Sequence, residues 1–294
     1  YGEHLEDLRV RAAVGGRNFA VRYVCKAGRQ TFTHYLRRIA GRYLQLHISG
    51  VKDRFVLYYA GVRPTEYPVT AKGSFVSPDS LHNKIYEVST RTLHLCMHEH
   101  YEDCPWREQA LYSMDSRNQA LCGYYCFGEY NFPAASFELL GDGLKDDGYL
   151  ELCAPAEVHI TIPSFSLAWI IESAELFLYG GNSAFCKAVM PKIRTMLDTY
   201  LATLKDGLFP CPQGRRYWHF YEWSYGLDGT AETGGFGNLT TLRFDAPLNL
   251  FLCLALDSAA LIARDGCEDA ELADKYAAYA DNIRRVFHEA FWEE

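Results

Sequence analysis

Beyond residue 76 the chain is divided into helical stretches by turns rich in glycine and proline, and this pattern limits the fold most. At Ser77-Pro78-Asp79, a serine N-cap, a proline at the first helical position and an acidic first turn precede apolar residues at helical spacing. We predict a helix from there to about Cys96. Pro191 lies inside a later stretch and should kink it. About six helices in this order would pair as antiparallel hairpins; after the first, they are predicted over 115–140, 166–178, 183–204, 247–263 and 268–291.

The first 75 residues show a different pattern, in which apolar and polar side chains alternate along short segments. Segments 43–48, 54–59 and 67–69 are predicted to be strands on this basis. We interpret residues 1–75 as the C-terminal part of a β-sandwich domain and residues 76–294 as a separate helical domain.

Composition narrows the classes of function. The formal net charge of -8 argues against a phosphate-binding surface, so we expect no nucleic-acid partner. We find no apolar run near the roughly 18 residues that span a bilayer, and we expect no membrane partner. An aromatic content of 15% suits either a tightly packed core or a carbohydrate cleft.

The ten cysteines form no CxxC pair, so we expect most of them to be reduced and buried. This favours a cytoplasmic location. Because the chain begins with tyrosine and not methionine, a periplasmic or secreted protein stays open, and the chain is expected to be an internal piece of a longer one.

One segment, 103–115, concentrates three carboxylates and an arginine between two predicted helices. A carboxyl group can protonate a leaving glycosidic oxygen when its neighbours keep it neutral, while other carboxylates and a guanidinium bind sugar hydroxyls. From the residues alone, a salt-bridge network at a helix start is the more ordinary interpretation.

Four stretches of the chain are distinctive, namely RPTEYPV, MHEHYEDCPWREQALYSMDSRNQALCGYY, TIPSFSLAWI and YEWS. They resemble the catalytic module of α-L-rhamnosidases of glycoside hydrolase family 78. This resemblance implies a mainly α fold, an (α/α)6 toroid of six hairpins preceded by β-sandwich domains, and inverting hydrolysis of terminal α-L-rhamnose. Residues 76–294 would then be the first part of the catalytic barrel, truncated to about its first half.

The resemblance places the family's general acid on Glu108 and its sugar-binding groups on Asp103, Arg107 and Asp115. The like charges of Asp103 and Asp115 are expected to favour a protonated Glu108, whereas Arg107 favours the carboxylate. The net direction depends on the geometry of the loop.

Two tryptophans, Trp169 and Trp223, match positions that line the family's pocket, where an apolar wall would face the methyl group of a 6-deoxy sugar. Each could instead be a core residue of its helix. Glu222 is predicted either to bind a hydroxyl or to cap its loop. Trp106 and Tyr112 flank the acid and are expected either to shield it or to pack in the core.

An inverting mechanism needs a second carboxylate roughly 6.5 to 9.5 Å from the acid, to activate water. No residue matches the family's base, and the surroundings of Glu222 and Glu232 do not resemble it. We therefore expect the base outside this chain, which alone would be a catalytically incomplete fragment.

Two further motifs do not indicate a metal or a cofactor. His98-Glu99-His100 lacks the HExxH spacing of zinc enzymes, so structural histidines are predicted there. The glycine-rich stretch 234–237 lacks the GxGxxG spacing of dinucleotide-binding proteins and is predicted to be a loop.

The expected partner is a rhamnose-containing glycoside or oligosaccharide, and a homodimer is left open. Three alternatives also stay open. The chain could belong to a six-hairpin hydrolase for another sugar, to a noncatalytic carbohydrate-binding protein, or to a purely structural helical scaffold.

Overall fold

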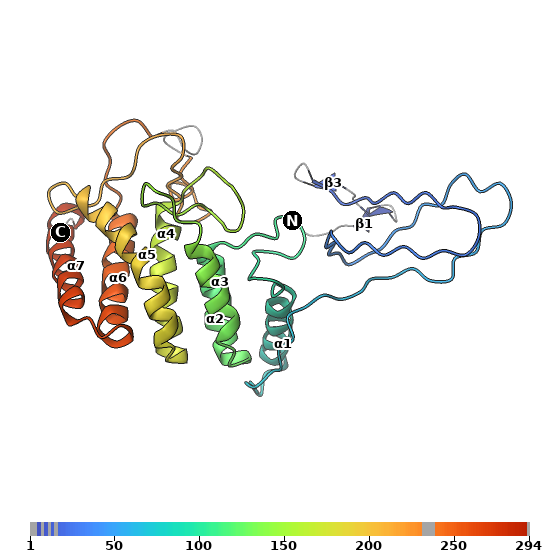
Figure 1. Cartoon of the computed structure of the whole chain (residues 1–294), viewed down its shortest axis with the longest axis horizontal. Helices are drawn as coiled ribbons and strands as arrows, with labels where there is room; N and C mark the ends of the chain where they lie inside the picture. The colour runs from blue at the N-terminus through green and yellow to red at the C-terminus, as the bar shows by residue number, and fades with distance from the viewer. Residues whose placement is uncertain (1–4, 7–8, 11–12, 15–16, 231–238, 293–294) are drawn as a thin grey trace.

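A computed structural model describes residues 5–6, 9–10, 13–14, 17–230 and 239–292 (Figure 1). Within these residues the fold is mainly α-helical, and the few strands, β1 to β4, are two residues long each and lie between Leu5 and Asn18. The helices are α1 (Ser80–Leu95), α2 (Ser113–Cys126), α3 (Asn131–Gly141), α4 (Pro163–Gly180), α5 (Ser183–Ala202), α6 (Ala246–Leu261), the π-helical turn η1 (Ile262–Gly266) and α7 (Ala270–Phe291).

Helix α4 is at the centre of the helical part. It packs against α2 and α6, while α3 and α5 contact each other and cover it from a second row. Buried residues make up 12 of its 18 positions, as expected for a helix that is apolar on nearly every side. The predicted mainly α architecture of paired helices, typical of a six-hairpin domain, is confirmed.

The connections between helices differ in length at the two ends of the molecule. Four residues join α2 to α3 and two join α4 to α5, so the chain reverses direction there. The three long connections, 96–112, 142–162 and 203–245, gather at the opposite end, where α2, α4 and α6 begin (Figure 1). Of the predicted site residues, Asp115 and Trp169 lie in helices. The others lie in these connections: Asp103, Arg107, Glu108, Glu222 and Trp223.

Short contacts join the three connections to one another. Isolated β-bridges pair Leu111 with Ala154 and Thr161 with Tyr217. The Ser113 hydroxyl, at the start of α2, donates a 2.5 Å hydrogen bond to the carbonyl of Phe165 in the first turn of α4. The end of the molecule at which α2, α4 and α6 begin is therefore a continuous platform.

Helix starts follow from local capping. The side chain of Asp79 accepts from the Leu81 N–H at 2.8 Å, so Asp79, and not the predicted Ser77, is the N-cap of α1. The predicted helix over 115–140 is two helices, because the chain turns at 127–130, where Gly128 adopts a φ of 54°. Pro191 lies inside α5, which continues to Ala202.

The predicted strands 43–48, 54–59 and 67–69 are not formed. Among the described residues, 19–76 contain no helix or strand, and much of this segment extends away from the helices in long loops (Figure 1). Large apolar side chains such as Leu44 and Tyr59 remain exposed. Alternation alone does not make a sheet, because each strand needs a hydrogen-bonded neighbour and a second layer to cover its apolar face. The division of the chain near residue 75 stays a prediction.

The segment Ala246–Gly266, which comprises α6 and η1, is long and apolar enough to cross a membrane, contrary to the expectation from the sequence. Most of it is buried against other parts of the protein, with α6 packed between α4 and α7. Its apolar composition is explained by its place in the core.

Candidate active site

The connection between α1 and α2 carries the predicted acid, and its own hydrogen bonds set its shape. The Asp103 N–H donates to the Ala110 carbonyl at 3.0 Å, and the Ala110 N–H donates to Asp103 Oδ1 at 3.0 Å. Gln109 has a φ of 55°, a left-handed conformation that costs a residue with a side chain some energy. Asp103 thus closes a loop around Glu108.

The two carboxylate oxygens of Glu108 have different partners. The Tyr112 hydroxyl donates to Oε2 at 2.9 Å, and the Arg107 guanidinium forms an ion pair with Oε1. A quarter of the Glu108 side chain (25%) is exposed, so a ligand can reach it. Burial, followed by the contact with Glu108, raises the pKa of Tyr112 well above its usual range, so this hydroxyl stays a donor.

Crowding of carboxyl groups has its clearest effect on Asp115, in the first turn of α2. Burial, followed by the negative charges of Asp103 and Glu108, raises the pKa of Asp115 to about 6. The charges of Asp103 and Glu108 therefore act on Asp115. The predicted effect of Asp103 and Asp115 on Glu108 stays a prediction.

Next to the loop in sequence, Glu102 forms a second ionic contact, in which the glutamate side chain is fully buried and the arginine is partly exposed. Arg38, from the N-terminal segment, forms an ion pair with Glu102 and places Nη1 2.7 Å from Oε2, while His98 Nδ1 lies 3.0 Å from the same oxygen. Burial raises the pKa of Glu102, but the contacts with His98 and Arg38 outweigh it and lower the pKa overall. His98 is therefore a structural histidine, as predicted.

Trp106 also connects the loop to the N-terminal segment. Its ring stacks on that of Phe19 with 5.1 Å between centroids. The loop that carries Glu108 is therefore held from both sides, by α2 and by the residues before the helical part.

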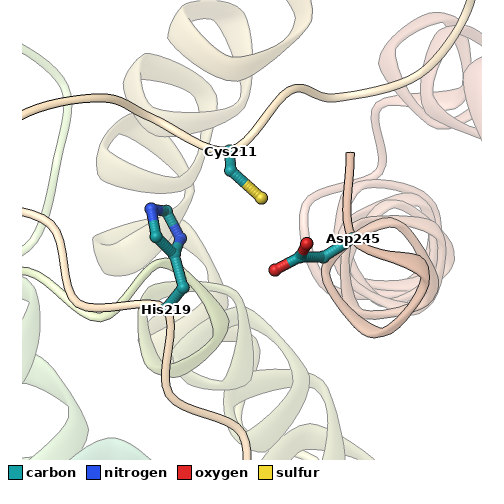
Figure 2. A group of neighbouring side chains, drawn as sticks. All are labelled: Cys211, His219 and Asp245. Carbon is teal, nitrogen blue, oxygen red and sulfur yellow. The ribbon is translucent and has the colours of Figure 1, made fainter. Parts of the chain in front are cut away.

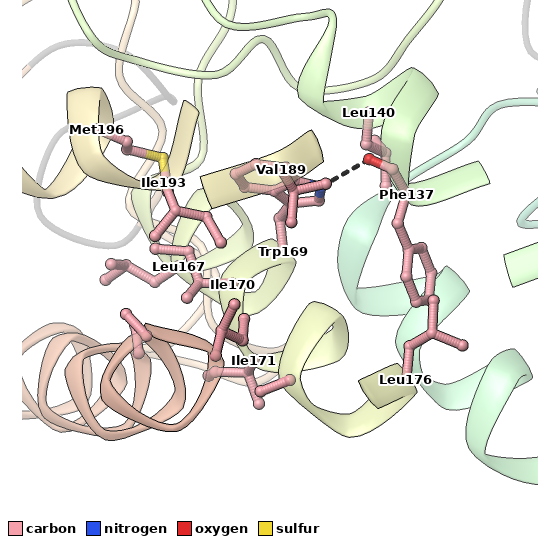
Figure 3. Packing of buried hydrophobic residues seen from close by; sticks show 14 of the residues in the cluster. Phe137, Leu140, Leu167, Trp169, Ile170, Ile171, Leu176, Val189, Ile193 and Met196 are labelled. Atoms are coloured by element: carbon pink, nitrogen blue, oxygen red, sulfur yellow. Dashed lines mark hydrogen bonds between the residues drawn. The ribbon is translucent and has the colours of Figure 1, made fainter. Parts of the chain in front are cut away.

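Trp169 does not face a sugar pocket, and this prediction is wrong. The side chain is fully buried in α4, and its indole N–H donates to the Phe137 carbonyl of α3 at 2.8 Å (Figure 3). A Cβ on Gly141 would lie only 2.8 Å from the indole, so the glycine makes room for it. Trp169 joins α3 to α4 as a core residue, the alternative that the sequence left open.

Trp223 is exposed over 75% of its surface, in the connection between α5 and α6. Its ring packs against those of Phe220, at 4.8 Å, and Trp218, at 5.8 Å. Phe220 in turn contacts Phe165 at the start of α4. Trp223 is thus presented by an aromatic cluster on the platform that also carries the acid loop.

Glu222 caps its own turn, since Oε1 accepts from the Trp223 N–H at 2.6 Å. This agrees with the capping alternative for Glu222. Glu232 and the glycine-rich stretch 234–237 lie outside the described residues.

The sequence interpretation overlooked Glu172, a carboxyl group fully buried in α4. Its Oε2 accepts from the Ser116 hydroxyl at 2.7 Å, and burial raises its pKa well above the usual range. A glutamate inside the apolar run Trp169-Ile170-Ile171 to Ala174 was the available signal.

A third group of reactive side chains, also overlooked, comprises Cys211, His219 and Asp245. Cys211 and His219 lie in the connection between α5 and α6, and Asp245 is the N-cap of α6 (Figure 2). Their potential ligand atoms all lie within 4.8 Å of one another. Among the described residues, this is the group of histidine, cysteine and carboxylate side chains suited to hold a metal ion.

The described part of the chain is a domain of helical hairpins with carboxylates and an exposed tryptophan on loops at one end. Residues 70–294 match the family described as the bacterial alpha-L-rhamnosidase 6 hairpin glycosidase domain, and the chain belongs to that family. No curated protein matches the chain in a sequence comparison.

Solved structures of rhamnosidases share the fold. The family 78 rhamnosidase of Bacillus sp. GL1 is 27% identical with a TM-score of 0.68, and the match covers 78% of this chain and 22% of that one. A Klebsiella oxytoca rhamnosidase with rhamnose bound is 17% identical, with a TM-score of 0.59 over 78% of this chain and 41% of that one. The Streptomyces avermitilis α-L-rhamnosidase complexed with L-rhamnose is 17% identical, with a TM-score of 0.56 over 77% and 20%. The chain spans between a fifth and two fifths of the length of these proteins.

Proposed function

We propose that this chain forms the acid-bearing part of an inverting α-L-rhamnosidase. The observation that carries the proposal is Glu108, which lies on a loop with Asp103 and Arg107, keeps a quarter of its side chain exposed and accepts a hydrogen bond from Tyr112. A carboxyl group that a ligand can reach, beside other carboxylates and a guanidinium, is the arrangement that general-acid cleavage of a glycoside uses. Membership of the rhamnosidase family and the rhamnose-bound relatives support rhamnose as the sugar.

In this proposal Glu108 protonates the leaving glycosidic oxygen, and Asp103, Arg107 and Asp115 bind sugar hydroxyls. The Arg107 guanidinium forms an ion pair with Glu108. In the proposal the sugar draws Arg107 toward its hydroxyls, and Glu108 donates its proton to the leaving oxygen. Tyr112 then remains as the hydrogen-bond donor that orients Glu108.

Trp223 supplies the apolar wall in this proposal, in place of Trp169. Its exposed ring is rigidly supported by Phe220 and Trp218, and an indole face suits the methyl group and apolar face of a 6-deoxy sugar. The water-activating carboxylate is proposed to lie beyond residue 294, so the chain acts as a fragment of a longer enzyme. The greater length of the solved relatives supports this.

The test is hydrolysis of two α-L-rhamnosides by the full-length protein, one with a p-nitrophenyl and one with an alkyl leaving group. Glu108→Gln should lower kcat by about 10²- to 10⁴-fold on the alkyl glycoside. The loss should be much smaller on the p-nitrophenyl glycoside, because p-nitrophenolate leaves without needing a proton. Glu138→Gln, an exposed control in α3, should leave both rates unchanged.

Equal rates for Glu108→Gln and the wild type on the alkyl glycoside would contradict the assignment of the acid. A panel of p-nitrophenyl glycosides identifies the sugar. Hydrolysis of a glucoside or glucuronide, without hydrolysis of the rhamnoside, would favour a six-hairpin enzyme for another sugar. Tight rhamnose binding without hydrolysis of any panel member would indicate a noncatalytic binding protein.

A further inference from the structure

The group formed by Cys211, His219 and Asp245 brings three different ligand types together in a mostly buried place. Cys211 is 2% exposed and His219 is 6% exposed. The thiol, imidazole and carboxylate atoms all lie within 4.8 Å of one another. We propose that these three residues form a zinc-binding site.

The hydrogen bonding of His219 prepares it as a ligand. Its Nε2 lies 2.9 Å from the Pro212 carbonyl, which can only accept, so Nε2 carries the proton and Nδ1 carries a lone pair. Nδ1 has no hydrogen-bond partner among the described residues. The ring turns Nδ1 toward Cys211 and Asp245 (Figure 2). Metal-binding histidines commonly hold the second ring nitrogen on a backbone carbonyl in this way.

The ligand types select the metal. A thiolate and an imidazole suit zinc, whereas calcium and magnesium prefer sites made only of oxygen atoms. Zinc bonds of about 2.0 to 2.3 Å place tetrahedral ligand atoms roughly 3.5 Å apart. Because the ligand atoms lie within 4.8 Å of one another, the group would contract by up to roughly 1.3 Å when zinc binds.

Two neighbouring side chains, Arg243 and Tyr221, hold the Asp245 carboxylate in place. Arg243 approaches its carboxylate through Nε at 2.8 Å and Nη2 at 3.0 Å, and the Tyr221 hydroxyl donates to Oδ2 at 2.9 Å. Oδ2 accepts from both Tyr221 and Arg243, whereas Oδ1 has one partner among the described residues and a further lone pair for a metal. Arg243 also reduces the net negative charge of the site, so the cation must be one that bonds strongly to sulfur and nitrogen.

An adjacent cavity provides a fourth ligand position. It has a volume of about 280 Å³ and is lined by His219, Tyr221, Arg243 and Asp245 among others. A water molecule in this cavity completes a tetrahedron with the three protein ligands. The Cys211 thiol would lose its proton to solvent when zinc binds.

A zinc ion here would join the beginning of the long 203–245 connection to the start of α6. The same connection presents Trp223 on the platform, and the Phe220 carbonyl accepts from the Ser164 hydroxyl of α4 at 2.7 Å. The inferred role of zinc is therefore to hold this connection in place, and it does not depend on which sugar the protein cleaves.

The experiment measures metal content and spectra of the 294-residue chain without an affinity tag. After dialysis against zinc and then metal-free buffer, elemental analysis should find one zinc per chain. Replacement by Co²⁺ should give the intense visible bands of a tetrahedral ion and a thiolate-to-cobalt charge-transfer band in the near ultraviolet. Zinc should also raise the Tm of the wild type, and a chelator should reverse the increase.

Cys211→Ser should remove the charge-transfer band and weaken zinc binding by about 100-fold or more. Asp245→Asn and His219→Gln should weaken zinc binding while circular dichroism shows that the helices persist. Cys253→Ser removes another buried thiol, one that contacts the Ala280 carbonyl, and should bind zinc as the wild type does. The proposal is overturned if the wild type holds no zinc, or if folded Cys211→Ser keeps both the stoichiometry and the charge-transfer band.

Discussion

At the scale of single residues, Asp115 and Glu108 have different surroundings. Burial of Asp115, followed by the charges of Asp103 and Glu108, raises its pKa to about 6. Glu108 is held by Arg107 and Tyr112 and keeps a quarter of its side chain exposed. The ionised form of Asp115, a residue proposed to bind the sugar, is therefore unfavourable in the folded protein.

The raised pKa of Asp115 predicts that Asp115→Asn stabilises the fold. The ionised group disfavours folding, so the penalty is absent below pH 3.8, grows as the pH rises and is complete above about 6. The free energy of unfolding should rise by up to about 3 kcal/mol at pH 7.5 and by roughly 1 kcal/mol at pH 4.5. Urea unfolding at both pH values measures this.

Asp265→Asn, an exposed control, should change the free energy of unfolding by less than about 0.5 kcal/mol at either pH. A lower stability of Asp115→Asn at pH 7.5 would show that the native structure favours the Asp115 carboxylate. The stabilised variant is expected to lose hydrolysis, because an amide replaces a proposed sugar ligand.

At the scale of helices, the core role of Trp169 predicts a large effect of truncation. Trp169→Ala removes a fully buried indole between α3 and α4 and leaves a cavity, so the free energy of unfolding should fall by about 3 to 5 kcal/mol. Trp223→Ala is the matched control, and because that ring is 75% exposed the loss should be about 1 kcal/mol or less. Chemical denaturation of both variants gives the comparison.

The two tryptophan variants also separate stability from sugar binding. Folded Trp223→Ala is expected to bind rhamnose more weakly, whereas folded Trp169→Ala should bind it as the wild type does. Similar losses of stability in the two variants would contradict the core assignment of Trp169.

Helix positions could be predicted from the sequence because their signals are local. Prolines in the first turns of α4 and α6 and glycine after α4 mark the boundaries directly in the chain. The strand predictions were wrong because strand formation depends on signals that are not local. Pairing partners and a covering layer are properties of distant segments, which alternation within one segment does not specify.

In the candidate site, too, the sequence predicted groups of neighbouring residues but not contacts between distant segments. Glu108, Asp103 and Arg107 are near one another in the sequence, so one short motif was enough to group them. Trp169 was misplaced because periodicity does not distinguish a core-facing aromatic from a pocket-facing one. Cys211, His219 and Asp245 were missed because they follow no metal-binding spacing, and only folding of the long 203–245 connection brings them together.

At the scale of the whole molecule, Arg38 connects the N-terminal segment to the acid loop. The Glu102 side chain is 0% exposed, so loss of its guanidinium partner leaves a buried carboxylate with one imidazole contact. Arg38→Met should lower the free energy of unfolding by about 3 to 5 kcal/mol near neutral pH. The change in denaturation midpoint at constant m-value measures this.

The double variant Arg38→Met/Glu102→Gln provides the control. Removing the charge of Glu102 should recover most of the lost stability, because the neutral amide needs no cation. If the stability loss of the double variant equals the sum of the losses of the two single variants, the two side chains do not act as a pair.

The Arg38–Glu102 contact also bears on where this chain can be divided. The family match begins at residue 70, but the buried Glu102 is paired with an arginine 32 residues before that point. A protein fused at that boundary would contain the buried Glu102 without Arg38, its counterion. We expect the helical part to be inherited together with the segment that precedes it, and not exchanged as an independent module.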